Sequence, residues 1–397
     1  MKILGIDTSC DETCVSVIER SKKSEIKILS NIVSSQIKIH AKYGGIVPGL
    51  AKREHQKNLT LVLKKSLKKA GLLQKRKTNL KIDKPKLEIL KNILSRETIL
   101  LKKSLRFLQQ YETPDIDCVA ITVGPGLEPA LWSGVNFAKT LSFFWKKPII
   151  PINHLEGHIL ANWLTPVSLN HKSEITNYKN IFPAVCLIAS GGHTELVLMK
   201  KIGNYKLIGE TRDDAAGECI DKIGKILGLP YPGGPAISKI VAKKTGHTDL
   251  KIKLPRPMIN SKDYDFSFSG LKTAVLYNYK SQKPKTKKSE NYIKTMCEES
   301  QQAIIDVLIS KTKNAAAKFK VKTILLGGGV TANSELRRQM KKNIKKNLSM
   351  VDYMEPKIKF CADNAAMIGI TGLFNITKKT KHWKEIEANA NLNIYEL

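Results

Sequence analysis

Two stretches of the chain repeat one pattern of apolar and polar positions. Residues 2–18 contain an apolar run, the polar turn Thr8-Ser9-Cys10-Asp11-Glu12-Thr13 and a second apolar run, which together predict a strand–turn–strand unit. Residues 184–199 repeat this unit around the turn Ser190-Gly191-Gly192-His193-Thr194. Two copies in the two halves of the chain indicate a duplicated α/β domain with a cleft between the copies.

A third glycine-rich turn follows the predicted strand 323–326. Residues 327–333 form this turn, and the helical pattern of residues 335–340 follows it. Turns rich in Gly, Ser and Thr present backbone N–H groups and hydroxyls that bind phosphate oxygens, and a helix N-terminus favours anions. The three turns together predict an anion or nucleotide site.

Two segments interrupt the duplicated pattern. Residues 73–113 carry 11 Lys and Arg against 4 Asp and Glu, with apolar residues at helical intervals, so we expect a basic helical hairpin that packs on one domain. Residues 280–290 are too polar to bury a face and are expected to form a flexible basic loop. Either segment could contact RNA, and a solvated surface addition is an equally good interpretation of each.

The composition is that of a two-domain globular enzyme. The 397 residues are 42% hydrophobic and 26% charged, and no apolar run approaches the roughly 18 residues of a membrane span. The N-terminus lacks the apolar core of a secretory signal. The seven cysteines are scattered, with no C-x-x-C pair, which favours a reducing compartment. We therefore expect a cytoplasmic protein.

The net charge of +32 indicates a polyanionic partner, most plausibly nucleic acid. Only 9 of the 67 basic residues are Arg, and nucleotide bias in a genome can by itself produce an abundance of Lys. Lysine contacts phosphates as a point charge, whereas base edges are read better by Arg. The charge therefore favours backbone binding over sequence recognition.

His154 and His158 are the strongest candidates for metal chemistry. Four residues apart on a helix, their imidazoles share one face, and Asp363 can supply a third ligand. Two imidazoles and a carboxylate suit a catalytic Fe(II) or Zn(II) with open positions. Taken alone, two histidines at this spacing are more often surface residues than ligands, so the assignment depends on the rest of the chain.

The motifs of the chain, taken in order, resemble those of the TsaD family, which catalyses the transfer step of tRNA threonylcarbamoyladenosine (t6A) synthesis. The turn Ser190-Gly191-Gly192-His193-Thr194 is similar to the bacterial and mitochondrial branch, because archaeal and eukaryotic cytosolic relatives tend to have Asn in place of the His. The matching stretches are Gly5–Thr13, Tyr43–Pro48, Gly124–Leu127, Asn153–His158, Ser190–Thr194, Asp213–Glu218, Leu229–Pro235, Phe266–Ala274, Gly328–Asn333 and Cys361–Ala366.

The resemblance implies an actin-like (ASKHA) fold, in which duplicated RNase-H-like lobes surround a nucleotide cleft. The first lobe would comprise residues 1–150, with residues 372–397 packed back on it, and the second lobe residues 151–371, with the metal and adenylate site. The implied reaction moves the threonylcarbamoyl group of threonylcarbamoyl-AMP to N6 of adenosine 37 in tRNAs that read codons beginning with A. TsaB-like and TsaE-like proteins are implied partners, and a homodimer is the alternative.

The resemblance also assigns residues to roles. It implies one divalent metal, Fe(II) before Zn(II), held by His154, His158 and Asp363. Ser9, Asp11 and Glu12 are candidates for positioning or proton transfer. The residues expected to hold the adenylate and its threonylcarbamoyl group are Ile188, Ala189, Ser190, Gly191, Gly192, Asp221, Gly234 and Asn333.

Several positions depart from the family pattern. Gly49 occupies a position that is usually Glu, which puts in doubt any role carried over for a carboxylate there. Glu128-Pro129, Cys219 and Ala362 also differ from the usual residues, and none is a proposed ligand.

Three other classes of function fit parts of the pattern. In the His-Glu-x-x-His proteases the general base follows the first His, whereas Glu156 here lies about 200° around a helix from His154 and should point away from the metal. A kinase or ATPase of the same fold shares the phosphate turns but does not need the histidine pair. A TsaB-like scaffold keeps the fold without the metal ligands.

Overall fold

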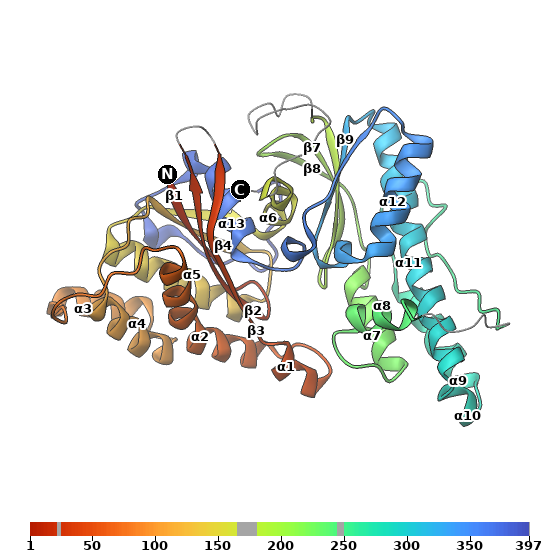
Figure 1. Ribbon diagram of the computed structural model, residues 1–397, viewed down its shortest axis with the longest axis horizontal. Helices are drawn as coiled ribbons and strands as arrows, with labels where there is room; N and C mark the ends of the chain where they lie inside the picture. The colour runs from red at the N-terminus through yellow and green to blue at the C-terminus, as the bar shows by residue number, and fades with distance from the viewer. Residues whose placement is uncertain (22–24, 165–180, 244–249, 397) are drawn as a thin grey trace. The chain divides into compact units, whose positions relative to one another are not determined.

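The computed structural model describes residues 1–21, 25–164, 181–243 and 250–396. The chain forms two compact units, each built around a five-stranded sheet (Figure 1). The first unit comprises Met1–Lys38, Ile46–Asn177 and Asp363–Leu397, and the second comprises Ile39–Gly45 and Tyr178–Ala362. The lobe boundary between residues 150 and 151 stays a prediction.

The sheet of the first unit has the strand order β3-β2-β1-β4-β5. Strand β1 is antiparallel to β2, which is antiparallel to β3, while β1, β4 and β5 run parallel. The predicted strand–turn–strand unit of residues 2–18 is thereby confirmed. The strands are β1 (Lys2–Asp7), β2 (Glu12–Arg20), β3 (Ile26–Ser35), β4 (Cys118–Gly124) and β5 (Ile149–Asn153).

Helices cover both faces of this first sheet. Helices α2 (Pro48–Lys69) and α5 (Glu128–Trp145) pack on one face, and α13 (Ala365–Phe374) packs on the other. Two glycines allow α13 to approach closely: a Cβ on Gly5 would lie 2.5 Å from the carbonyl oxygen of Ala365, and a Cβ on Gly369 would lie 2.5 Å from Ile18 Cγ1. This close approach brings the residues just before α13 to the sheet. Two short helices, α1 (Ile37–His40) and α6 (His154–Leu160), also lie in the N-terminal half of the chain.

The segment expected to be a basic helical hairpin contains two helices. These are α3 (Lys84–Ile93) and α4 (Thr98–Gln110). Leu90 of α3, Leu100 of α4 and Leu94 just after α3 are buried and join the core of the first unit. The periodic apolar positions therefore mark the buried face of each helix, as the sequence predicts.

The sheet of the second unit repeats the topology of the first. Its order is β10-β9-β6-β7-β8, with β6, β7 and β8 antiparallel in sequence and β6, β9 and β10 parallel. Read in reverse, this order matches the first sheet strand for strand, which is the duplicated RNase-H-like topology of the actin-like (ASKHA) fold. The strands are β6 (Ala184–Ala189), β7 (Thr194–Lys201), β8 (Asn204–Glu210), β9 (Thr323–Gly327) and β10 (Asp352–Met354).

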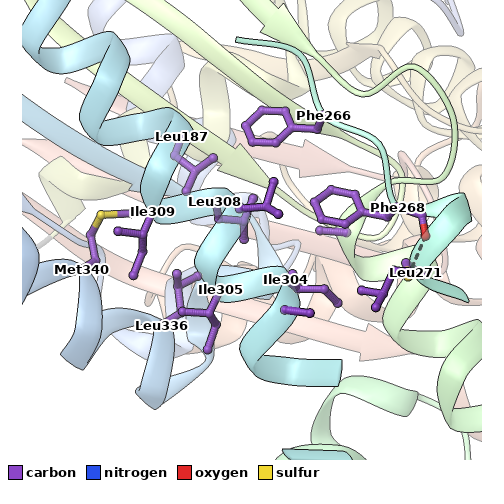
Figure 2. Packing of buried hydrophobic residues seen from close by; sticks show 14 of the residues in the cluster. Leu187, Phe266, Phe268, Leu271, Ile304, Ile305, Leu308, Ile309, Leu336 and Met340 are labelled. Atoms are coloured by element: carbon purple, nitrogen blue, oxygen red, sulfur yellow. Dashed lines mark hydrogen bonds between the residues drawn. The ribbon is translucent and has the colours of Figure 1, made fainter. Parts of the chain in front are cut away.

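The core of the second unit lies between its sheet and a layer of helices. Figure 2 shows Leu187 from β6 facing Leu308 and Ile309 from α11, with Leu336 and Met340 from α12 completing the cluster. The helices of this unit are α7 (Ala216–Ile226), α8 (Gly233–Val241), α9 (Ser269–Ser281), α10 (Pro284–Lys287), α11 (Glu290–Lys318) and α12 (Ser334–Asn347).

The expectation of a flexible loop over residues 280–290 is wrong. The segment contains the end of α9, the short helix α10 and the start of α11. Its order depends on aromatic packing outside the segment: Lys287 Nζ lies 5.3 Å from the ring centre of Tyr279, which in turn contacts Tyr292. A pattern confined to residues 280–290 contains no sign of these contacts.

Candidate metal centre and substrate-binding turns

The two histidines lie on a helix that begins where strand β5 ends. Asn153 closes the strand and caps α6, because its side-chain oxygen accepts hydrogen bonds from the backbone N–H groups of Leu155 and Glu156. Every residue of α6 is buried, including His154 and His158. The predicted helical spacing is confirmed, and the interpretation as two surface histidines is wrong.

Asp363 reaches the same place from the other end of the chain. It directly precedes Asn364, whose side-chain oxygen caps α13 by accepting a hydrogen bond from Met367 N–H at 3.2 Å. Helix α13 is held against α6 at Gly157, where a Cβ would lie 3.0 Å from Ile368 Cδ1. Two capped helices of the first unit therefore fix all three predicted ligands.

The three ligands converge on one small volume. Asp363 Oδ1 lies 3.5 Å from His154 Nε2 and 3.2 Å from His158 Nε2, and one ligand atom from each residue can be chosen so that all lie within 4.8 Å of one another. Ligands at about 2.1 Å from a shared ion are ~3.0–3.5 Å apart in octahedral or tetrahedral positions. The spacing therefore suits one metal ion.

The unpartnered ring nitrogens of His158 also fit a bound metal ion. His158 Nε2 is close to Asp363 but not aligned for a hydrogen bond, and among the described residues neither of its ring nitrogens has a hydrogen-bond partner. Buried polar atoms are normally satisfied, so such nitrogens call for a partner of another kind. A divalent metal bound by His154, His158 and Asp363 would supply it.

The charges around the histidines favour a cation. Burial opposes ionisation of both His154 and Asp363, but their mutual attraction is stronger, so the pKa of Asp363 is held well below its usual range. The charges of Asp363 and Asp7 likewise outweigh burial and raise the pKa of His154. His158, for which burial dominates, has a lowered pKa and stays neutral, the form in which it binds metal.

Asp7 is a residue of this centre that sequence reasoning missed. Its carboxylate ends strand β1, is fully buried, and places Oδ1 3.7 Å from His154 Nδ1, the nitrogen opposite Nε2. Nδ1 has no hydrogen-bond partner among the described residues, so the carboxylate acts on the imidazole through its charge, which raises the basicity of the ring. The available signal was an acidic residue at the end of an otherwise apolar strand.

The turn that follows Asp7 contains the predicted residues Ser9, Asp11 and Glu12. Ser9 and Asp11 are buried, and Ser9 N–H donates to Asp7 Oδ1 at 3.2 Å. Burial, followed by the charges of Asp11 and Asp363, raises the pKa of Glu12 well above its usual value, while Ser35 donates a hydrogen bond to it. The turn is therefore an acidic neighbour of the metal ligands, and the catalytic roles of its residues stay predictions.

The second unit brings its predicted glycine turns into contact. Ser190 accepts a hydrogen bond from Gly217 N–H at the start of α7, and a Cβ on Gly328 would lie 2.3 Å from the carbonyl oxygen of Ala189. The turn after β6 thus touches both the start of α7 and the turn after β9. Gly191 and Gly192 are exposed, and a Cβ on either would meet no atom within 4 Å. Their backbone is therefore open to a ligand.

Asp221, Gly234 and Asn333 continue this chain of contacts. Asp221 Oδ1 accepts a hydrogen bond from Gly233 N–H at 2.7 Å, which ties α7 to the start of α8 next to Gly234. Asn333 caps α12 and also donates to Ser238 of α8 at 3.2 Å. The predicted substrate residues from Ile188 to Gly192, with Asp221, Gly234 and Asn333, therefore belong to one connected group of turns and helix N-termini. Their binding roles stay predictions.

Glu156 does not point at the metal ligands as a protease base would. Its side chain is buried and accepts a hydrogen bond from Asn375 Nδ2 at 2.9 Å. This partner agrees with the position of Glu156 on the helix and removes the metalloprotease interpretation.

Comparison with known proteins agrees with the site. The family model described as "TsaD: tRNA N6-adenosine threonylcarbamoyltransferase" matches residues 27–78 and 98–370. The chain belongs to the TsaD family. It is 40% identical to the tRNA N6-adenosine threonylcarbamoyltransferase of Thermosipho africanus, over 99% of this chain and 100% of the relative. The enzyme of the same name from Bacillus subtilis is 38% identical over 95% of this chain and 91% of its own.

The family match also clarifies the insertion and the departures. The TsaD model leaves residues 79–97 unmatched, a stretch that contains α3. Of the departures, a Cβ at Gly49 would meet no atom within 4 Å, and Cys219 is buried, with its Sγ 3.4 Å from the carbonyl oxygen of Phe268. None of these departures lies at His154, His158 or Asp363.

Proposed function

We propose that this chain transfers the threonylcarbamoyl group of threonylcarbamoyl-AMP to N6 of adenosine 37 in tRNAs that read codons beginning with A, with release of AMP. The buried group of His154, His158 and Asp363 carries this proposal within the TsaD family. A kinase or ATPase of the same fold has no need of such a group, and a non-catalytic scaffold has no reason to keep it.

The chemistry of the donor explains what the protein must supply. Threonylcarbamoyl-AMP is a mixed anhydride and is already activated, so no covalent enzyme intermediate is required. The acceptor N6 is a weak nucleophile, because its lone pair is delocalised into the adenine ring. The enzyme has to hold donor and acceptor in line and stabilise charge on the carbonyl and the departing phosphate.

The turns of the second unit supply the phosphate and ribose contacts in this proposal. Open backbone N–H groups around Gly191 and Gly192 suit phosphate oxygens. The carboxylate of Asp221, which uses one oxygen to hold Gly233, can accept bonds from ribose hydroxyls. Asn333 uses its side chain to cap α12 and to hold Ser238, so its contribution is to keep the neighbouring turn in place.

The first unit supplies the metal ligands. His154, His158 and Asp363 would hold a divalent ion, which would supply Lewis-acid stabilisation of the charge that develops in the transfer. The charge of Asp7 keeps the imidazole of His154 basic, which favours binding of the ion. Ser9, Asp11 and Glu12 are proposed to position the reacting groups or to move the proton that leaves N6. Fe(II) is the proposed ion and Zn(II) the alternative, because two imidazoles and one carboxylate with open positions suit both.

The partners follow from the reaction. tRNA is the acceptor, and a TsaB-like and a TsaE-like protein are the proposed companions, with a homodimer as the alternative. We propose a cytoplasmic location, where tRNA is modified. In the described parts of the chain, no helix is both long enough and apolar enough to cross a membrane.

Mass spectrometry of t6A tests the reaction directly. The protein is incubated with tRNA, threonine, bicarbonate, ATP and a TsaC-type synthase that makes the donor, with and without the partner proteins. We expect t6A at adenosine 37 only when this protein is present. An otherwise complete mixture that contains the partners and still forms no t6A would contradict the proposal.

A further inference from the structure

We propose that the end of α9 and the adjoining α10 form a tRNA-binding surface, defined by Tyr277, Lys280, Lys283, Lys285 and Lys288 and called the basic tip below. The inference rests on the proposed function, which makes tRNA the acceptor, and it adds where the acceptor binds. Its ligand is the phosphate backbone of tRNA together with one unstacked base.

The charge of the basic tip is uncompensated. Residues 266–289 contain six lysines and no acidic residue. Lys280, Lys283, Lys285 and Lys288 are exposed, and no ion pair within the described ranges of the chain involves them. By contrast Lys272, at the other end of α9, is paired with Asp214 at 3.1 Å. Four free ammonium groups on a short stretch therefore face solvent.

The basic tip is ordered rather than loose. Tyr292 of α11 is buried and donates a hydrogen bond from its hydroxyl to Asn278 of α9 at 2.9 Å. Lys287 packs over the ring of Tyr279, which fixes α10 against α9. Figure 1 shows α10 at the end of α9 next to the start of α11. The lysines are thus presented in a fixed arrangement, which lowers the entropy lost on binding.

Tyr277 gives the surface a second kind of contact. Its side chain is 67% exposed, on the same helix as Tyr279, whose ring is packed. An exposed aromatic ring among lysines is the combination that binds unpaired nucleotides, because the ring stacks on a base while the ammonium groups bind phosphates. A surface that only kept the protein soluble would not need the ring.

The beginning of α9 links the basic tip to the substrate residues of the same unit. Asp213, three residues before α7, accepts hydrogen bonds from the backbone N–H groups of Phe268 and Ser269. Helix α7 carries Asp221, so one rigid path joins that residue to the tip. Helix α9 is about 20 Å long at 1.5 Å per residue. An adenylate cannot span this length, whereas a tRNA stem-loop can.

The four lysines of α12 provide a matched control. Lys341, Lys342, Lys345 and Lys346 are also exposed, and Lys345 and Lys346 lie in the last turn of α12, where the helix dipole favours cations. Replacing all four by Gln changes the net charge by the same amount as replacing the four lysines of the basic tip. Any effect of total charge is therefore equal in the two variants.

Binding of an unmodified tRNA transcript, measured over a range of salt concentrations, tests the proposal. The variant with Lys280→Gln, Lys283→Gln, Lys285→Gln and Lys288→Gln should bind at least about tenfold more weakly near physiological salt. Its plot of log Kd against log salt should be shallower by about 3, because each of the four lost phosphate contacts contributes ~0.7–0.9 to the slope. The α12 variant should stay close to wild type. Equal losses in both variants, or none in the tip variant, would overturn the proposal.

Variants of Tyr277 distinguish the contribution of base stacking to tRNA binding from that of charge. Tyr277→Ala should weaken tRNA binding about tenfold with little change in salt slope, and Tyr277→Phe should restore it, because Phe retains the stacking face. Met350→Ala, which removes another highly exposed apolar side chain, is the control. If Tyr277→Ala binds as wild type does, the ring has no part in tRNA binding.

Enzyme kinetics keep this inference distinct from the proposed function. In the t6A assay the tip variants should raise KM for tRNA and leave kcat at saturating tRNA nearly unchanged. Wild-type protein that forms t6A while the tip variants keep its KM would sink the binding surface and leave the proposed function standing. Wild-type protein that binds tRNA through the tip but forms no t6A would do the reverse.

Discussion

The turn between β1 and β2 and the turn between β6 and β7 occupy equivalent places in two sheets of the same topology, yet they present opposite surfaces. Ser9 and Asp11 of the first turn are buried beside an acidic group. Gly191 and Gly192 of the second turn are exposed, with open space at the position of a Cβ. The same topology can therefore support two kinds of site, and the residues of the turn determine which kind is formed.

The two turns differ because they favour ligands of opposite charge. At the start of the first turn, the carboxylate of Asp7 lies 3.7 Å from His154, and its charge favours a cation. The second turn presents backbone N–H groups, which favour an anion. The two turns therefore differ in the charge of the ligand that each favours, and each can be disturbed separately.

Loss of a metal ligand should have the largest effect. His158→Ala removes one of three ligands, so purified protein should lose most of its metal, and t6A formation should fall at least about 100-fold. Elemental analysis and the mass-spectrometric assay measure the two effects. His382→Ala, which removes an exposed histidine, is the matched control. Full metal content in His158→Ala would show that the first turn does not border a metal site.

A Cβ on Gly328 should break the second site by disturbing its fold. The residue has φ of 90°, and the added carbon would lie 2.3 Å from Ala189 O, so Gly328→Ala should lower the free energy of unfolding by about 2–4 kcal/mol. Denaturant unfolding measures it. Gly191→Ala meets open space and should keep stability within about 0.5 kcal/mol while weakening AMP binding. Equal stabilities of the two variants would contradict this distinction.

Asp7 offers a further test of the difference between the two turns, because no carboxylate precedes the second turn at the equivalent position. Asp7→Asn keeps the shape but removes the charge beside His154 Nδ1, so metal affinity should fall about 10–100-fold. Competition with a metal chelator measures this. Asp115→Asn, on an exposed residue, should keep wild-type affinity. If Asp7→Asn also keeps wild-type affinity, the charge of Asp7 does not support metal binding by His154.

Asp213 should give the smallest effect, confined to acid pH. Burial opposes its ionisation, but hydrogen bonds from Ser267, Ser269 and the adjacent backbone lower its pKa to about 2. A depressed pKa stabilises the fold above the usual value near pH 4, and that stabilisation is lost as the pH falls towards 2. Asp213→Asn should therefore flatten the loss of stability over this range, measured by unfolding at several pH values. An unchanged slope would contradict the role of Asp213.

The sequence predicted the features that local patterns determine. The alternation of residues 2–18 and 184–199 predicted both hairpins, and the periodic leucines of 73–113 predicted α3 and α4, because apolar spacing follows directly from helix and strand geometry. The ligands His154, His158 and Asp363 were predicted from motif order, and the structure brings them together.

The rest depends on contacts between distant parts of the chain. Asp7 lies beside His154 only because β1 and β5 belong to one sheet, and nothing near Asp7 in the sequence indicates a histidine. Position 328 must be glycine because a Cβ there would meet the carbonyl oxygen of Ala189, which belongs to strand β6. The order of residues 280–290 depends on Tyr279 and Tyr292 outside the segment. Contacts between residues this far apart in the sequence cannot be predicted from the spacing of residues along the chain.

The late position of Asp363 has a consequence for protein synthesis. His154 and His158 leave the ribosome early, but the carboxylate that joins them precedes α13, close to the C-terminal end of the printed sequence. A nascent first unit therefore has two imidazoles and a sheet whose α13 face is bare until most of the second unit has been translated. In the proposed metal site, the third ligand is therefore present only after translation has passed residue 363, and a chain that ends earlier lacks it.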